Sequence, residues 1–219
     1  ILSGLVGSEM CIRDSFEASL VGYDVTFDNR LLSLNPCASI QQGTTPACTT
    51  RFFNVGSVSS RGGELTVIWK PTSYLQWYNS ASINRSTYDD NYVQNGVTIA
   101  TAGKTTVDTP KRMLASEIAF NYAGWNVNLR GKYTGERFYT YTNDQGFGGY
   151  TSFDAGAGYE FGQVSMLQSL KLSLNVTNLT DKRYASNLTA FANSDPNGRQ
   201  LAFHASAPRQ VFLTLDAKF

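Results

Sequence analysis

The sequence predicts an all-β fold, an antiparallel transmembrane β-barrel of which this chain supplies about eight long strands. Apolar and polar residues alternate with a period of two, the pattern of a strand whose two faces differ. The alternating runs extend over about 12–20 residues, whereas strands of globular proteins usually have about 5–6. Long polar connections alternate with short turns, as in outer-membrane barrels. A soluble β-sandwich has no reason to sort its connections in this way.

Each expected strand begins and ends at a turn or a polar segment. The first, residues 18–34, leads into a polar segment that contains two cysteines. The second, residues 51–70, ends before a tight turn at residues 71–73. Ala123 and Gly124 form a two-residue turn between two further strands. The remaining strands are expected at residues 74–88, 111–122, 125–142, 150–161, 169–184 and 208–219, with long loops at residues 89–109 and 185–207.

The two faces of the expected strands differ in chemistry. In residues 125–142, Leu129 and Tyr133 alternate with Arg130 and Lys132. An apolar face suits lipid, and a polar face suits a water-filled lumen. Candidates for the lumen face are the charged residues Glu117, Arg130, Lys132 and Lys171. We expect them to form structural ion pairs and hydrogen bonds more readily than a solute site.

Composition is compatible with a soluble β-sandwich, an extracellular β protein or a membrane barrel, and argues against several other classes. Charged residues make up 16% of the chain, below the roughly 25% of an ordinary soluble domain. The formal charge is +1, so nothing in the balance indicates a nucleic-acid partner. No apolar run reaches the roughly 18–20 residues of a transmembrane helix. Trp69, Trp77 and Trp125 lie near the short turns, where an aromatic girdle at a membrane interface is expected.

Residues 1–15 differ from the rest of the chain. They lack the basic start and the cleavage site of a signal peptide, and they do not alternate. The run from Leu5 to Ser15, LVGSEMCIRDS, resembles a translated sequencing-library adapter. We therefore treat residues 1–15 as an adapter-like artefact, not native, and residues 16–219 as the natural barrel portion.

The cysteines and the single histidine give no sign of catalysis. Cys37 and Cys48 close a short polar loop, which suggests a disulfide made in an oxidising compartment, with two free thiols as the alternative. His204 stands alone in a polar loop, where a histidine is more often solvated than catalytic. No catalytic, phosphate-binding or metal-binding motif occurs. We expect neither an enzyme nor a bound cofactor or metal.

Two segments near the C-terminus resemble TonB-dependent receptors. Residues 175–184, NVTNLTDKRY, resemble the penultimate-strand motif of that family, and residues 208–219, PRQVFLTLDAKF, resemble its closing strand. Arg61 to Leu65, RGGEL, is similar to an internal strand start of the same family. The resemblance implies a barrel of roughly 22 strands around an N-terminal plug, in the outer membrane of a Gram-negative bacterium. It also implies uptake of a scarce solute (a siderophore, vitamin or carbohydrate) coupled to TonB through the plug, which this sequence lacks.

The closing strand carries a further implication. Val211, Leu213, Leu215 and Phe219 share one face, and such an aromatic-ended strand resembles the signal that the barrel-assembly machinery recognises by edge pairing. Phe219 is alternatively a simple lipid anchor. The rival interpretations of the whole chain are a passive outer-membrane channel or other small barrel closed by eight strands, and a soluble extracellular β-sandwich adhesin.

Overall fold

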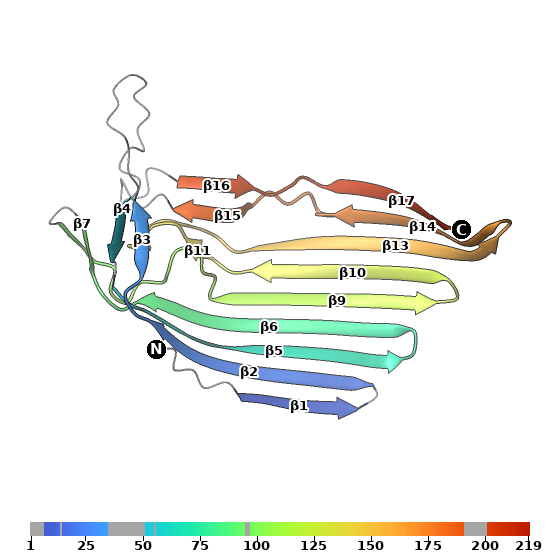
Figure 1. The fold of residues 1–219 in the computed structure, drawn as a ribbon, viewed down its shortest axis with the longest axis horizontal. Helices are drawn as coiled ribbons and strands as arrows, with labels where there is room; N and C mark the ends of the chain where they lie inside the picture. Colours follow the sequence, from blue (N-terminus) through green and yellow to red (C-terminus); the bar gives the residue numbers. More distant parts are fainter. Residues whose placement is uncertain (1–6, 14, 35–50, 55, 95–96, 191–200) are drawn as a thin grey trace, which may run out of the picture.

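The computed structural model describes the whole chain except residues 1–6, 14, 35–50, 55, 95–96 and 191–200. Every regular element in the described residues is a β-strand (Figure 1). Nine strands form one antiparallel sheet in the order β1-β2-β5-β6-β9-β10-β13-β14-β17. The bounds of these strands are β1 Gly7–Arg13, β2 Phe16–Phe27, β5 Val58–Thr72, β6 Leu75–Tyr88, β9 Arg112–Tyr122, β10 Trp125–Thr134, β13 Tyr150–Val164, β14 Leu167–Thr177 and β17 Gln210–Lys218.

The sheet is open in this chain. Each strand pairs with its neighbour along the chain once the small hairpins are set aside, and β1 and β17 lie at opposite edges. This up-and-down order confirms the predicted all-β, partial-barrel architecture. An arc with two edges leaves backbone N–H and C=O groups for other strands to pair with, and lipid cannot satisfy such groups.

The connections are sorted by length as predicted (Figure 1). At one end of the sheet the strands are joined by tight turns, such as Ala123 (φ 49°) and Gly124 (φ 84°), whose two positive φ values match a two-residue hairpin turn. At the other end the loops carry their own two-stranded hairpins. These pair β3 (Leu31–Leu34) with β4 (Arg51–Asn54), β7 (Tyr92–Gln94) with β8 (Val97–Ile99), β11 (Arg137–Phe138) with β12 (Gly146–Phe147), and β15 (Ala185–Ala190) with β16 (Leu201–Ala205).

All eight expected strands occur, but several end earlier than predicted. The strand expected at residues 18–34 breaks near Asn29 (φ 56°), and the one expected at 169–184 ends at Thr177, before Asn178 (φ 50°). The two-residue period was extended too far because the loop hairpins also contain β-favouring residues. The structure also adds β1, which pairs with β2 along residues 7–13, where no strand was predicted.

The register assigns each residue of the large sheet to one of two faces. On β2 and β13, the positions that share a face with Arg130 are less exposed than the alternating ones, as expected on the concave side of a curved sheet. The opposite, convex face carries large exposed apolar side chains, among them Leu20, Leu114, Leu129 and Leu213 at 47–71% exposure. An apolar face of this extent requires an apolar environment.

The buried hydrophobic core lies at the loop end of the sheet, where the ends of β5 and β6 meet the loops. Val58, Tyr88 and Tyr141 form one buried cluster, with Val107 packed against it, and Tyr92 packs with Ile99 in another. Both clusters belong to the loop end of the molecule. Packing therefore fixes the loops above the sheet, while backbone pairing fixes the sheet itself.

Candidate functional site

The concave face carries a row of charged and polar side chains across the middle of the sheet. Arg130 on β10 lies directly opposite Glu117 on β9 and Asp154 on β13. Arg130 Nη2 and Nε lie 2.6 and 2.8 Å from Glu117 Oε2. The Arg130 side chain is 58% exposed, so solvent screens this pair and its net contribution is about 0–1 kcal/mol.

The two lysines proposed for the lumen face lie apart from this pair. Lys132 occupies the next polar row, opposite Ala115 and Ser152. Lys171 lies on β14, directly between Glu160 on β13 and Asp216 on β17. Glu160 is six residues along β13 from Asp154, so Lys171 is far from the Arg130 row. Among the described residues, neither lysine has an ion pair. The structure therefore brings together Glu117 and Arg130, and separates Lys132 and Lys171 from them.

A pocket of about 420 Å³ opens where the concave face meets the loops. Its wall side is formed by Val58 and Ser60 on β5 and by Ser86 on β6, with Phe27 at the end of β2. Its loop side is formed by Asp28, Arg30, Thr106, Val107 and Thr109. The pocket thus combines strand ends with two loops.

Hydroxyl groups line this mouth pocket and bond to one another. Ser60 Oγ donates to Ser86 Oγ at 2.7 Å, and Thr106 Oγ1 donates to Thr109 Oγ1 at 2.9 Å. The Arg30 guanidinium lies 5.7 Å from the centre of the Tyr88 ring, a cation–π contact that holds the cation at the rim. The arrangement offers hydroxyl donors and acceptors, the Arg30 cation, the Asp28 carboxylate and an aromatic wall to a polar solute.

A buried arginine joins three loops beside this mouth. Arg137 is 6% exposed in its side chain, and its Nη1 lies 2.8 Å from Asp108 Oδ1. The same guanidinium donates to the carbonyl oxygens of Ala185 and Ser186, and lies 5.6 Å from the Tyr150 ring centre. Five guanidinium donors in a planar fork can serve several acceptors at once, which a lysine cannot do. Sequence reasoning missed this residue because its partners lie in distant loops.

Two loop groups have ionisation behaviour set by their surroundings. Burial raises the pKa of the Tyr141 hydroxyl well above its ordinary value, and the neighbouring Tyr88 adds to the effect. The Thr142 hydroxyl, followed by that of Thr140, lowers the pKa of the exposed Asp144 carboxyl by hydrogen bonding to its charged form. Neither group lies in a cluster of histidine, cysteine and acidic side chains that could hold a metal ion, among the described residues.

The motif at residues 175–184 has a structural role that the geometry explains. Asn178 is buried, and its side-chain amide donates to the carbonyl oxygens of Lys182 and Ala207 at 3.0 and 2.9 Å. The Asn178 backbone amide donates to Asp154 Oδ1 at 2.8 Å, and the Arg209 amide donates to Asp181 Oδ1 at 2.8 Å. These bonds tie the loop after β14 to the start of the closing strand and to the concave face.

The other predicted residues are placed as follows. Cys37 and Cys48 lie outside the described residues. His204 was expected in a loop, but it lies exposed on β16, paired with Asn187, because the loop folds into a hairpin.

The predicted apolar residues lie on the convex face. On edge strand β17, 62–71% of the surface of Val211, Leu213 and Leu215 is exposed, and Phe219 after it is 83% exposed. Trp69 and Trp77 also lie on the convex face, with their ring centres 6.2 Å apart beside a tight turn. The described part of the chain contains no helix able to cross a bilayer.

Comparisons with known proteins agree with this architecture. The chain matches the family described as "TonB dependent receptor-like, beta-barrel" over residues 7–179. No curated protein sequence matches it. Similar solved structures include the ferric yersiniabactin uptake receptor FyuA from Yersinia pestis (TM-score 0.70, 16% identity, 97% of this chain and 29% of that one). A second similar structure is the siderophore receptor PiuA from Acinetobacter baumannii (TM-score 0.68, 18% identity, 94% of this chain and 26% of that one). A third is the copper transporter OprC (TM-score 0.62, 16% identity, 96% of this chain and 30% of that one). The chain thus spans less than a third of each of these proteins.

Proposed function

Because the chain belongs to the TonB-dependent receptor β-barrel family, we propose that it forms part of the wall of an outer-membrane receptor that takes up a scarce solute. The observation that carries this proposal is the mouth pocket of about 420 Å³ at the loop end of the concave face. Active transport through such a receptor requires the plug and TonB, which the family supplies elsewhere in the protein. The receptor works in the outer membrane of a Gram-negative bacterium.

The lining of the pocket favours an anionic, oxygen-rich solute. Arg30 provides the cation, and Ser60, Ser86, Thr106 and Thr109 provide hydroxyls. Metal chelates of the siderophore class have this chemistry, and the names of the similar structures include siderophore receptors. A vitamin or carbohydrate would use the hydroxyls, and the Arg30 charge would then be offset only by Asp28 in the same lining.

The wall residues and the closing strand have supporting roles in this proposal. Glu117, Arg130, Lys132 and Lys171 face the lumen, where they form the polar lining of the solute path or contact the plug. The edge of β17 offers a row of backbone groups to the barrel-assembly machinery, with Phe219 at its end. Outer-membrane lipid covers the convex face.

The competing function is a passive outer-membrane channel. The test is uptake of a radiolabelled ferric siderophore by cells whose receptor contains this segment. Active uptake stops when TonB is deleted or the proton gradient is collapsed, whereas passive flux continues and would exclude the receptor proposal.

The mouth pocket is tested by single substitutions in the same receptor. We expect Arg30→Gln to weaken binding of the ferric siderophore roughly tenfold, the loss of one charge-assisted contact of about 1.4 kcal/mol. Lys70→Gln removes the same charge beside a tight turn at the other end of β5 and is the matched control. Equal binding by both variants would place the solute elsewhere.

A further inference from the structure

Three arginines form a cluster on the convex face, at the loop end of its apolar region. Arg61 on β5 lies directly opposite Arg85 on β6, and Arg112 on β9 lies opposite Ile83, two residues from Arg85 on the same face. All three side chains are exposed. We call Arg61, Arg85 and Arg112 the outer arginine cluster.

The charge of the outer arginine cluster is only partly balanced by its neighbours in the sheet. Like charges directly opposite one another in a sheet are destabilising. Asp24 lies opposite Arg61 on β2, yet no ion pair within 4.0 Å involves any of the three arginines among the described residues. Counting Asp24, this patch of the convex face has a net charge of +2. An external anion is the simplest group that removes the repulsion.

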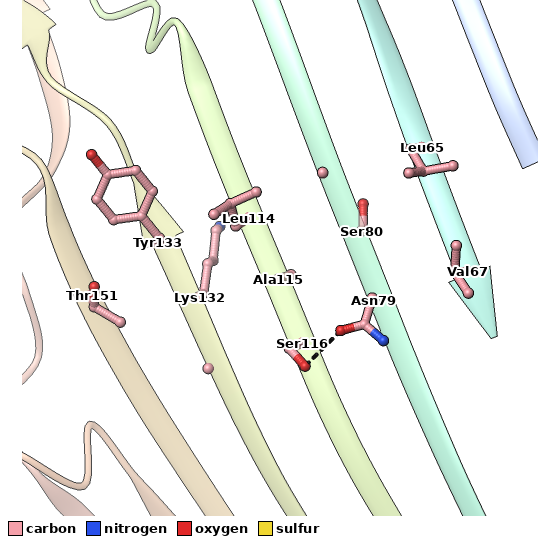
Figure 2. Close-up of a pocket in the computed structure, with 12 residues that line it drawn as sticks. Leu65, Val67, Asn79, Ser80, Leu114, Ala115, Ser116, Lys132, Tyr133 and Thr151 are labelled. Atoms are coloured by element: carbon pink, nitrogen blue, oxygen red, sulfur yellow. Dashed lines mark hydrogen bonds between the residues drawn. The ribbon is translucent and has the colours of Figure 1, made fainter. Parts of the chain in front are cut away.

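An apolar hollow of about 380 Å³ lies on the same face, toward the middle of the sheet. Its lining comes from the five neighbouring strands β5, β6, β9, β10 and β13. Figure 2 shows it extending from Leu65 and Val67 to Thr151. It exists because Ala81 and Gly131 are small where their neighbours Leu65, Leu114 and Tyr133 are large.

The polar groups in the hollow bond to one another. Trp77 Nε1 donates to Ser116 Oγ, which donates to Asn79 Oδ1, each at 2.9 Å (Figure 2 marks the second bond). The floor of the hollow is therefore compatible with hydrocarbon even though it contains an asparagine and a serine.

The hollow and the cluster are adjacent. A second depression of about 200 Å³ is lined by Lys111, Arg112 and Glu136, and shares Tyr133 with the apolar hollow. Along β5, Leu65 and Arg61 are four residues apart on one face, about 13 Å at the rise of an extended strand. This separation suits a molecule that is apolar at one end and anionic at the other.

We propose that this convex surface binds one lipid with a phosphomonoester headgroup, its phosphate on the outer arginine cluster and an acyl chain in the apolar hollow. Guanidinium groups bind phosphate through two parallel hydrogen bonds, and a phosphomonoester carries about −1.5 to −2 charges at neutral pH. The phosphate therefore neutralises the cluster that the sheet itself leaves unpaired. The site is separate from the mouth pocket, which lies on the concave face.

The test uses the full 219-residue chain refolded in zwitterionic detergent micelles, with lipid binding measured by native mass spectrometry. Dioleoyl phosphatidic acid is the phosphomonoester probe, and dioleoyl phosphatidylcholine has the same acyl chains without net charge. We expect one phosphatidic acid bound at least tenfold more tightly than phosphatidylcholine. Equal affinity for the two lipids would overturn the proposal.

Matched variants separate the cluster from general charge. The triple variant Arg61→Gln, Arg85→Gln and Arg112→Gln should lose the preference for phosphatidic acid. The triple variant Lys70→Gln, Lys104→Gln and Lys218→Gln removes the same charge from other exposed positions and should keep it. Circular dichroism checks that both variants retain their strands. Equal loss in both would show non-specific attraction and would refute the site.

The acyl part is tested independently. Ala81→Phe fills the hollow and should weaken binding of phosphatidic acid at least fivefold. Glycerol 3-phosphate, which has the headgroup without the chains, should not compete at concentrations a hundredfold above the lipid. Effective competition by glycerol 3-phosphate would show a phosphate site alone and would exclude a lipid.

Discussion

Replacing Arg137 by methionine should loosen the loops without unfolding the sheet. The methionine keeps most of the side-chain volume but removes every hydrogen bond that the guanidinium donates. Asp108 then loses its ion-pair partner, and the carbonyl oxygens of Ala185 and Ser186 lose their donor.

The expected size of the effect follows from burial. Breaking a buried ion pair by removing one partner costs about 3–5 kcal/mol. Asp108 is 28% exposed and regains part of its hydration when Arg137 is removed. We therefore expect Arg137→Met to lower the stability of the joined loops by about 2–4 kcal/mol. Arg130→Met breaks the other ion pair described in this chain, where the arginine is 58% exposed, and should cost no more than about 1 kcal/mol.

Hydrogen exchange measures this difference at individual amides. The Asp108 amide donates to Phe138 O at 2.9 Å and the Leu188 amide donates to Asp108 Oδ2 at 3.3 Å, so both report on the joined loops. In Arg137→Met their exchange should accelerate about 30- to 1,000-fold, because each 1.4 kcal/mol corresponds to a factor of ten. If the loop amides of Arg137→Met exchanged no faster than those of Arg130→Met, the reasoning from burial would be wrong.

Three further predictions concern the tyrosines and the two faces of the sheet. Tyr92→Phe removes a buried hydroxyl that has no hydrogen-bond partner among the described residues, and should be neutral or stabilising. Tyr88→Phe removes the hydroxyl that accepts a hydrogen bond from the Val107 amide and should cost about 1 kcal/mol; both changes are measured by thermal unfolding. Because burial raises the pKa of Tyr141, its contribution to stability is fully present below the ordinary value of 10.0 and is lost as pH rises above it. Tyrosinate absorbance at 295 nm should follow that loss of stability, and Tyr141→Phe should reduce the loss, with the remainder due to other buried tyrosines such as Tyr88. Leu213→Lys should destabilise the chain in lipid vesicles by about 2–4 kcal/mol, and Phe212→Lys, on the concave face, by much less, as urea titration would show.

The strands could be predicted from sequence because their signal is local. β9 ends at Tyr122 and β10 begins at Trp125, as predicted, because the alternation is uninterrupted up to the turn at Ala123 and Gly124. That two-residue turn also sets the register, so the pairing of Glu117 with Arg130 follows from sequence once the turn is recognised. The faces of the sheet follow from the same alternation.

The loops could not be predicted in this way because their contacts are not local. Arg137 contacts Asp108 and Ala185, which are 29 and 48 residues away, and no periodic pattern connects them. The mouth pocket has the same origin. Arg30 and Thr106 are distant in sequence, and both reach the pocket because the sheet brings the ends of their neighbouring strands together. Period-two alternation also continues into the loop hairpins, which is why the four strands expected at residues 18–34, 51–70, 125–142 and 169–184 were too long.

The limits of the apolar band emerge only when register and alternation are combined. On the convex face of β5, the sequence runs from Trp69 through Val67 and Leu65 to Arg61, eight residues or about 26 Å along an extended strand. The apolar band of an outer-membrane barrel is about 25 Å tall, and strand tilt shortens the projected length of these eight residues. Aromatic residues mark the turn end of this band and arginines mark its loop end. Arg61 and Arg85 pair directly across β5 and β6, Arg112 follows on β9, and Asp24 is the one acidic residue opposite them in the described sheet. The loop-end boundary is therefore a line of net positive charge, which is the chemistry that the proposed lipid phosphate would meet.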